Sequence, residues 1–274
     1  MRYPNLPLEP SNALRNGTQM SANTPTLVLV HGAFTDASVW HDVIAKLHQR
    51  NLRVLAPAMP MRGLASDAAY LRGFLTTIQG PIVVAGHSYG GSIISRPDAL
   101  TSAVRALVFI AAFQQDAGET AGELNARFPG SKLTGDTTLI REYPGGSDLY
   151  LQPDHFADVY ASDVDAVTVA VMAAAQHPIN PIALGETFDW EATWSSLPSW
   201  ALISTIDNSI PTEALRFMGR RAGSHIVEVE SSHAIPVSHP AETAEIIAKA
   251  ATAAVDDDAR SWSCTQPSSS YGTK

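Results

Sequence analysis

The sequence predicts an α/β fold, in which a doubly wound, mainly parallel sheet of about six strands carries helices on both faces. Short, continuous apolar runs rich in branched residues recur along the chain, as in strands that are buried on both faces of a sheet. Segments with helical periodicity separate these runs. Residues 113–194 contain no such strand and predict a mostly helical cap that is inserted into the core.

The elements follow from these patterns in chain order. Strands are expected at residues 26–30, 52–56, 81–85, 104–111, 200–205 and 225–229. Helices are expected at residues 37–49, 67–78, 213–221 and 241–253. Within the cap, apolar stretches around Pro144-Gly145-Gly146 predict a hairpin over 139–151, and an Ala-rich stretch predicts a helix over 163–176.

These elements divide the chain into a core and an insertion. We expect residues 26–112 and 195–255 to form the core and residues 113–194 to form the cap. Residues 1–25 are expected to be a flexible arm that carries no chemistry. Residues 256–274 are expected to be a disordered tail, because they hold too little apolar surface to offset the entropy of ordering.

Composition excludes several classes of function. With 45% apolar residues among 274, the chain can bury a full core, and its net charge of −9 leaves no basic stripe for nucleic acid. Cys264 is the single cysteine, so neither an intrachain disulfide nor a cysteine metal cluster is possible, and we expect no metal. No run is long enough for a signal peptide or membrane span, which favours a soluble, cytoplasmic protein. No signal for an oligomeric state is present.

The segment Gly86-His87-Ser88-Tyr89-Gly90 joins an expected strand to a helical pattern, an arrangement called a nucleophile elbow. A serine on such a sharp turn needs glycine two positions before and after it, and lies at a helix N-terminus. There the Tyr89 N–H can face a developing oxyanion. This context predicts that Ser88 is a nucleophile, whereas the alternative is a Gly-rich turn whose serine caps the helix. Pro97 predicts that this helix is short or kinked.

A serine hydroxyl needs a general base, and the base needs an orienting acid. His233 follows the last expected strand, at the carboxyl edge where Ser88 also lies, and is the expected base. Asp207 follows the penultimate strand and is the expected acid, with Asp116 as its competitor after an earlier strand. The order Ser, Asp, His is the one that this architecture uses.

The loop after the first expected strand is expected to complete an oxyanion hole. Gly32 allows a tight turn, and the Ala33 N–H is the expected partner of the Tyr89 N–H. His31 and His87 flank the site and are candidate pocket residues. Aromatic side chains that could line an apolar pocket, or else pack in the core, are Phe34, Trp40, Phe113, Phe128, Tyr143, Tyr160 and Trp190.

The segments VLVHGAF, GHSYGG, IDNSIP and SSHAIPVSHP together resemble the α/β-hydrolase superfamily over residues 26–253. The chain is similar to the compact esterase branch related to plant salicylate-ester hydrolases and hydroxynitrile lyases. The resemblance implies the α/β-hydrolase fold, a cofactor-free triad of Ser88, Asp207 and His233, and an acyl-enzyme intermediate. Serine at the elbow disfavours haloalkane dehalogenase and epoxide hydrolase chemistry. Ala234-Ile235-Pro236 stands where lyases of this branch carry a lysine, which weakens the lyase interpretation.

The sequence therefore predicts a serine hydrolase that cleaves a small carboxylic ester and needs no cofactor. Two alternatives stay open at this point. One is lyase, acyltransferase or perhydrolase chemistry on the same triad, and the other is a non-catalytic small-ligand receptor. A dinucleotide-binding function is excluded, because the glycines form GxSxGG and not GxGxxG.

Overall fold

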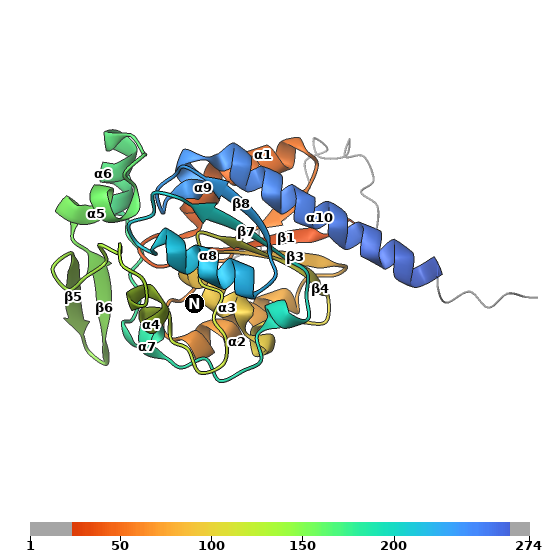
Figure 1. Cartoon of the computed structure of the whole chain (residues 1–274), viewed down its shortest axis with the longest axis horizontal. Coiled ribbons are helices and arrows are strands. Elements are labelled where there is room, and N and C mark those ends of the chain that lie inside the picture. Colours follow the sequence, from red (N-terminus) through yellow and green to blue (C-terminus); the bar gives the residue numbers. More distant parts are fainter. Residues whose placement is uncertain (1–23, 264–274) are drawn as a thin grey trace, which may run out of the picture.

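A six-stranded parallel sheet forms the centre of the fold in the computed structural model, which describes residues 24–263 (Figure 1). The strand order is β2-β1-β3-β4-β7-β8, and every neighbouring pair is parallel. The strands are β1 (Thr26–Val30), β2 (Arg53–Leu55), β3 (Ile82–His87), β4 (Val104–Ile110), β7 (Ser199–Ser204) and β8 (His225–Val229). The predicted fold class and all six predicted strands are confirmed, with small shifts at their ends.

Two apolar cores lie on opposite faces of this sheet. Leu27 and Leu29 belong to one core and Val28 and Val30 to the other, as the two-residue period of a strand requires. Helices α1 and α10 cover the first face, and α2 and α3 cover the second (Figure 1). The core helices are α1 (His41–Gln49), α2 (Leu64–Leu75), α3 (Tyr89–Ser95), α8 (Thr212–Arg221), α9 (Ile235–Ser238) and α10 (Pro240–Ser263).

The predicted helices differ from the structure at their boundaries. The segment predicted as one helix over 37–49 is a 3-10 helix, Ala37–Trp40, followed by α1. Helix α2 begins earlier than predicted, because the Glu186 carboxylate from the insertion accepts the N–H groups of Leu64 and Ala65. Helix α3 ends at Ser95, before Pro97, and is short as predicted.

The last helix corrects the predicted boundary of the tail. Helix α10 continues to Ser263, although residues from 256 onward were expected to be disordered. A helix that is anchored in a core adds further turns at little cost, because nucleation has already occurred. The rest of the predicted tail, 264–274, and residues 1–23 of the predicted arm lie outside the described residues.

The insertion contains a hairpin and four helices within residues 113–194. The predicted hairpin is present as antiparallel strands, and the predicted helix over 163–176 is present as α6. Helices α4, α5 and α7 are elements that the sequence pattern did not predict. The hairpin, α5 and α6 lie together at the left end of the view in Figure 1. These elements are α4 (Ala121–Ala126), β5 (Thr138–Tyr143), β6 (Gly146–Leu151), α5 (Pro153–Tyr160), α6 (Ala166–Ala174) and α7 (Ile182–Gly185).

The α-helices of the described residues range from 4 to 24 residues in length. Within residues 24–263, none of them combines the length and apolar character that crossing a membrane needs.

The close approach of α3 to the end of β1 yields a prediction for Gly90. A Cβ atom at Gly90 would lie 2.5 Å from the Val30 carbonyl oxygen, whereas a Cβ at Gly73 in α2 would meet nothing within 4 Å. We expect Gly90→Ala to lower the free energy of unfolding by about 2–4 kcal/mol, because backbone atoms must shift. The matched control Gly73→Ala should raise it by about 0.5–1 kcal/mol. Urea unfolding measures both values, and equal stabilities would contradict this account of the elbow.

Candidate active site

Ser88 lies on the sharp turn between β3 and α3. Its backbone has φ 55° and ψ −123°, a conformation that non-glycine residues rarely adopt. Three hydrogen bonds hold this turn: the Ser88 N–H donates to the Ile110 carbonyl (3.2 Å), and the Ser88 carbonyl accepts from Gly91 (3.0 Å) and Phe113 (3.2 Å). The serine is therefore fixed at the carboxyl edge of the sheet.

The loop after β1 crosses directly beside this serine. A Cβ atom at Gly32 would lie 2.6 Å from the Ser88 Cβ and 2.8 Å from the His87 carbonyl oxygen. No side chain fits there, so glycine is required for the approach. The next residue, Ala33, borders the same cavity as Ser88 and Tyr89. The two expected oxyanion donors therefore lie at one site.

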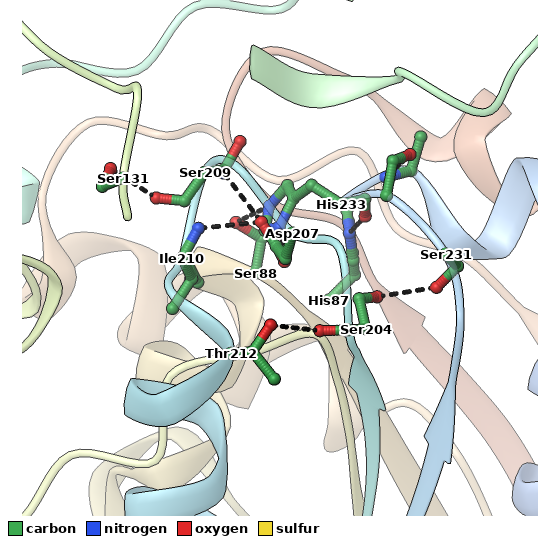
Figure 2. A network of polar contacts seen from close by, with 12 residues as sticks. His87, Ser88, Ser131, Ser204, Asp207, Ser209, Ile210, Thr212, Ser231 and His233 are labelled. Carbon is green, nitrogen blue, oxygen red and sulfur yellow. Dashed lines mark hydrogen bonds and ion pairs between the residues drawn. The ribbon is translucent and has the colours of Figure 1, made fainter. Parts of the chain in front are cut away.

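The structure brings Ser88, His233 and Asp207 into one chain of hydrogen bonds (Figure 2). The Ser88 Oγ lies 2.8 Å from His233 Nε2, and His233 Nδ1 lies 2.7 Å from Asp207 Oδ2. A carboxylate can only accept, so Nδ1 carries the proton and Nε2 is free to accept the serine proton. All three residues are buried.

The other oxygen of Asp207 is also occupied. Asp207 Oδ1 accepts the backbone N–H groups of Ser209 (2.7 Å) and Ile210 (2.9 Å), as Figure 2 shows. These bonds orient the carboxylate so that Oδ2 faces His233. The competing candidate Asp116 does not take this place, because His233 Nδ1 binds Asp207 Oδ2, whereas Asp116 Oδ1 accepts the N–H of Ala117 in the loop after β4.

The two flanking histidines support the backbone of the site. His87 packs against the His233 ring at a centroid distance of 4.9 Å, and its Nε2–H donates to the His233 carbonyl oxygen (2.9 Å). His31 Nε2 accepts the Met59 N–H (2.9 Å), so its Nδ1–H donates to the Gly32 carbonyl (2.9 Å). Burial lowers the pKa of His31 to about 4 and that of His87 well below its ordinary value. Both rings are therefore neutral near pH 7.

A cavity of about 50 Å³ borders Ser88 and His233. It lies between the loops of the core and the insertion, and none of the side chains that border it is Lys, Arg, Asp or Glu. The Tyr160 ring, which packs edge-on to His233 at 4.9 Å, forms part of the wall. The apolar walls come from Phe34, Phe113, Ala121, Leu133, Leu184 and Ile210.

The predicted pocket residues divide into two groups. Phe34 borders the cavity as predicted, whereas His31 and His87 lie outside its wall. Phe128 does not border this cavity; it packs against Phe217 at 5.7 Å and lines a neighbouring hollow that shares Gly122, Asn125, Leu133 and Leu184 with the cavity. Tyr143 is 39% exposed on the hairpin, where its hydroxyl accepts a hydrogen bond from Arg62.

Helix α4 brings residues to the cavity that the sequence analysis missed. Ala121, Gly122 and Asn125 all border it. A signal for this helix was present, because Thr120 and Glu123 form a capping box that begins α4. The positions of Leu133 and Leu184 depend on how the insertion folds back, and no local pattern marks them.

A metal ion in a protein is held by several ligating side chains that lie together. Within residues 24–263, no group of three or more His, Cys, Asp or Glu side chains is arranged to hold a metal ion.

Comparison with known proteins identifies relatives in sequence and in structure. The family model described as "Alpha/beta hydrolase family" matches residues 27–246. A carbendazim hydrolyzing esterase from Nocardioides sp. (strain SG-4G) is 29% identical over 106 residues, which are 34% of this chain and 44% of that protein. The match therefore spans less than half of that relative.

Two solved structures share the fold. A pyrethroid hydrolase from Sphingobium faniae JZ-2 superposes with a TM-score of 0.68 at 21% identity, covering 84% of this chain and 98% of that chain. A methylesterase from Arabidopsis superposes with a TM-score of 0.69 at 14% identity, covering 83% and 99%. At these identities the likeness is one of fold.

The burial of His31 predicts a pH dependence of stability. Its folded pKa of about 4 lies below the unfolded value of 6.5. Between these pH values the unfolded chain binds a proton at His31 that the folded protein does not bind. The contribution of His31 to the free energy of unfolding is therefore complete above pH 6.5 and is lost as the pH falls towards 4. From pH 7 to pH 5 we expect His31 to account for a loss of about 2 kcal/mol in unfolding free energy.

A variant separates this contribution from that of the acidic residues. His31→Asn should be less stable than the parent protein at pH 7. Between pH 7 and pH 5, its free energy of unfolding should fall by about 2 kcal/mol less than that of the parent protein. Urea unfolding at both pH values measures the difference. The same acid-induced loss in both proteins would show that His31 is not the cause.

Proposed function

Since this chain belongs to the alpha/beta hydrolase family, we propose that it is a serine esterase that cleaves a small, neutral carboxylic ester. The observation that carries the proposal is the chain of hydrogen bonds from Ser88 through His233 to Asp207, beside a small apolar cavity. Ester hydrolysis is further supported by the names of relatives, which include a carbendazim hydrolyzing esterase and a methylesterase.

Acylation is the first half of the proposed reaction. His233 Nε2 accepts the Ser88 proton as Oγ attacks the ester carbonyl carbon, and the oxyanion accepts the N–H groups of Ala33 and Tyr89. Asp207 stabilises the imidazolium. His233 then gives its proton to the leaving alcohol oxygen, the carbon–oxygen bond breaks, and the acyl group stays on Ser88.

Deacylation repeats these steps with water. His233 takes a proton from a water molecule, whose oxygen attacks the acyl carbon, and then returns the proton to Ser88 Oγ as the carboxylic acid leaves. Every bond and proton change is assigned to Ser88, His233 or water. The proposed cycle therefore needs no cofactor.

The side chains that border the cavity favour an uncharged substrate. Because none of them is Lys, Arg, Asp or Glu, a charged substituent would lose its hydration without gaining a partner. The same observation gives the lyase alternative less support, since no ammonium group borders the cavity and position 234 is a buried alanine. The strained backbone of Ser88 favours catalysis over simple ligand binding, which would not need it.

Ser88→Ala tests the nucleophile. We expect turnover of short p-nitrophenyl esters to fall by at least about 10⁴-fold, because no other group supplies the attacking oxygen. Circular dichroism and the unfolding midpoint should stay close to those of the parent protein. A variant that folds and keeps a substantial fraction of the parent's activity would refute the assignment.

Asp207→Asn tests the orienting acid against Asp116. In the variant, the amide oxygen would accept from Ser209 and Ile210, so the NH₂ group would face His233 Nδ1 and force the proton onto Nε2. This wrong tautomer cannot accept the serine proton, and kcat should fall by about 10³- to 10⁴-fold. The matched control Asp116→Asn should change kcat by less than about twofold. The opposite pattern would assign the acid role to Asp116.

A further inference from the structure

The last turn of helix α5, within the insertion, is bonded to the two loops that carry Asp207 and His233. The Asp158 carbonyl accepts the Asn208 side-chain NH₂ (2.8 Å), and the Val159 carbonyl accepts the Ser209 hydroxyl (2.8 Å). The Tyr160 carbonyl accepts the backbone N–H of Ala234 (2.9 Å). Carbonyls in the last turn of a helix have no partner within the helix, so these groups are free to bind other segments.

The residues that donate to α5 are neighbours of the proposed acid and base. Ser209 links α5 to the carboxylate itself, because its hydroxyl donates to Val159 while its N–H donates to Asp207 Oδ1. Ala234 directly follows His233 in the chain. Three consecutive carbonyls of one helix therefore fix two separate loops relative to each other.

Asp163, three residues after α5, binds Ser232, the residue that precedes His233. Its Oδ2 accepts the backbone N–H of Ser232 (3.0 Å), and its Oδ1 accepts the Ser232 hydroxyl. His239 Nδ1 lies 3.6 Å from the same carboxylate. His233 is thus flanked by Ser232, which Asp163 binds, and by Ala234, which the Tyr160 carbonyl binds.

We propose that the segment from Asp158 to Asp163 holds the loops of Asp207 and His233 at fixed positions relative to each other. In this proposal Asp163 is a positioning residue for His233. In this role the segment supports the loops of Asp207 and His233, and its Tyr160 ring also forms part of the cavity wall. The inference rests on the proposed function. Its physical basis is that a general base displaced by about 1 Å loses on the order of 10²-fold in rate.

Asp163→Ala tests this role. We expect kcat for a short ester to fall by about 10- to 100-fold with KM changed less than about twofold, because the base is displaced while the cavity wall is kept. The rate at which a fluorophosphonate modifies Ser88 should fall in parallel, and this readout requires no particular ester. Asp163→Asn should restore most of the rate, since its amide can accept the Ser232 N–H and donate to the Ser232 hydroxyl.

Two further variants separate positioning from general stability. Asp165→Ala removes the N-cap of α6, because the Asp165 carboxylate accepts the N–H groups of Val167 and Thr168 at the start of that helix. It should lower the unfolding midpoint and leave kcat within about twofold. Ser232→Ala should also lower kcat. In the double variant with Asp163→Ala, the fold-loss in kcat should be smaller than the product of the two single fold-losses, because both substitutions remove the same hydrogen bond.

The outcomes distinguish this inference from the proposed function. If Ser88→Ala is inactive but Asp163→Ala keeps the parent's kcat and labelling rate, the inference is overturned and the esterase proposal stands. Equal kcat losses in Asp163→Ala and Asp165→Ala would also overturn it, because they would reflect stability alone. If the parent protein neither hydrolyses esters nor labels at Ser88, the proposed function fails and the inference falls with it.

Discussion

The parallel direction of the strands is the constraint on which the rest of the structure depends. Because β1, β3, β7 and β8 all run the same way, the residues that follow them emerge at one edge of the sheet. Gly32, Ser88, Asp207 and His233 are such residues, although they are far apart in the chain. The central strands β1 and β3 are buried on both faces, and the loops at their carboxyl ends hold a strained serine and a short chain of hydrogen bonds.

The insertion adds side chains and hydrogen bonds to the site at the edge of the sheet. It supplies most of the apolar wall beside Ser88 and, through the end of α5, hydrogen bonds to the loops of Asp207 and His233. In the proposed mechanism, the same segment therefore supplies part of the cavity wall and a support for the acid and the base. Under this proposal, a shift of α5 would change the fit of the substrate and the positions of the acid and the base together.

The sequence predicted what depends on local patterns. Continuous apolar runs located all six strands, and the glycines around Ser88 marked the elbow because the turn leaves no space for side chains. Asp207 and His233 could be chosen because residues just after parallel strands share an edge. Short helices such as α4 and α7 leave little periodicity, although the capping box at Thr120 was a usable signal. Phe128 and Tyr143 do not border the cavity beside Ser88, because side-chain direction in the insertion depends on tertiary packing.

The central claim is that Ser88 is an activated nucleophile, and covalent labelling tests it most directly. The protein would be treated with a fluorophosphonate at neutral pH, digested, and analysed by mass spectrometry, with the His233→Ala variant treated in parallel. The account predicts one modification, on Ser88, which forms rapidly in the parent protein and slowly or not at all in the variant. An unmodified parent protein, modification at another residue, or labelling of Ser88 at the same rate without His233 would contradict it.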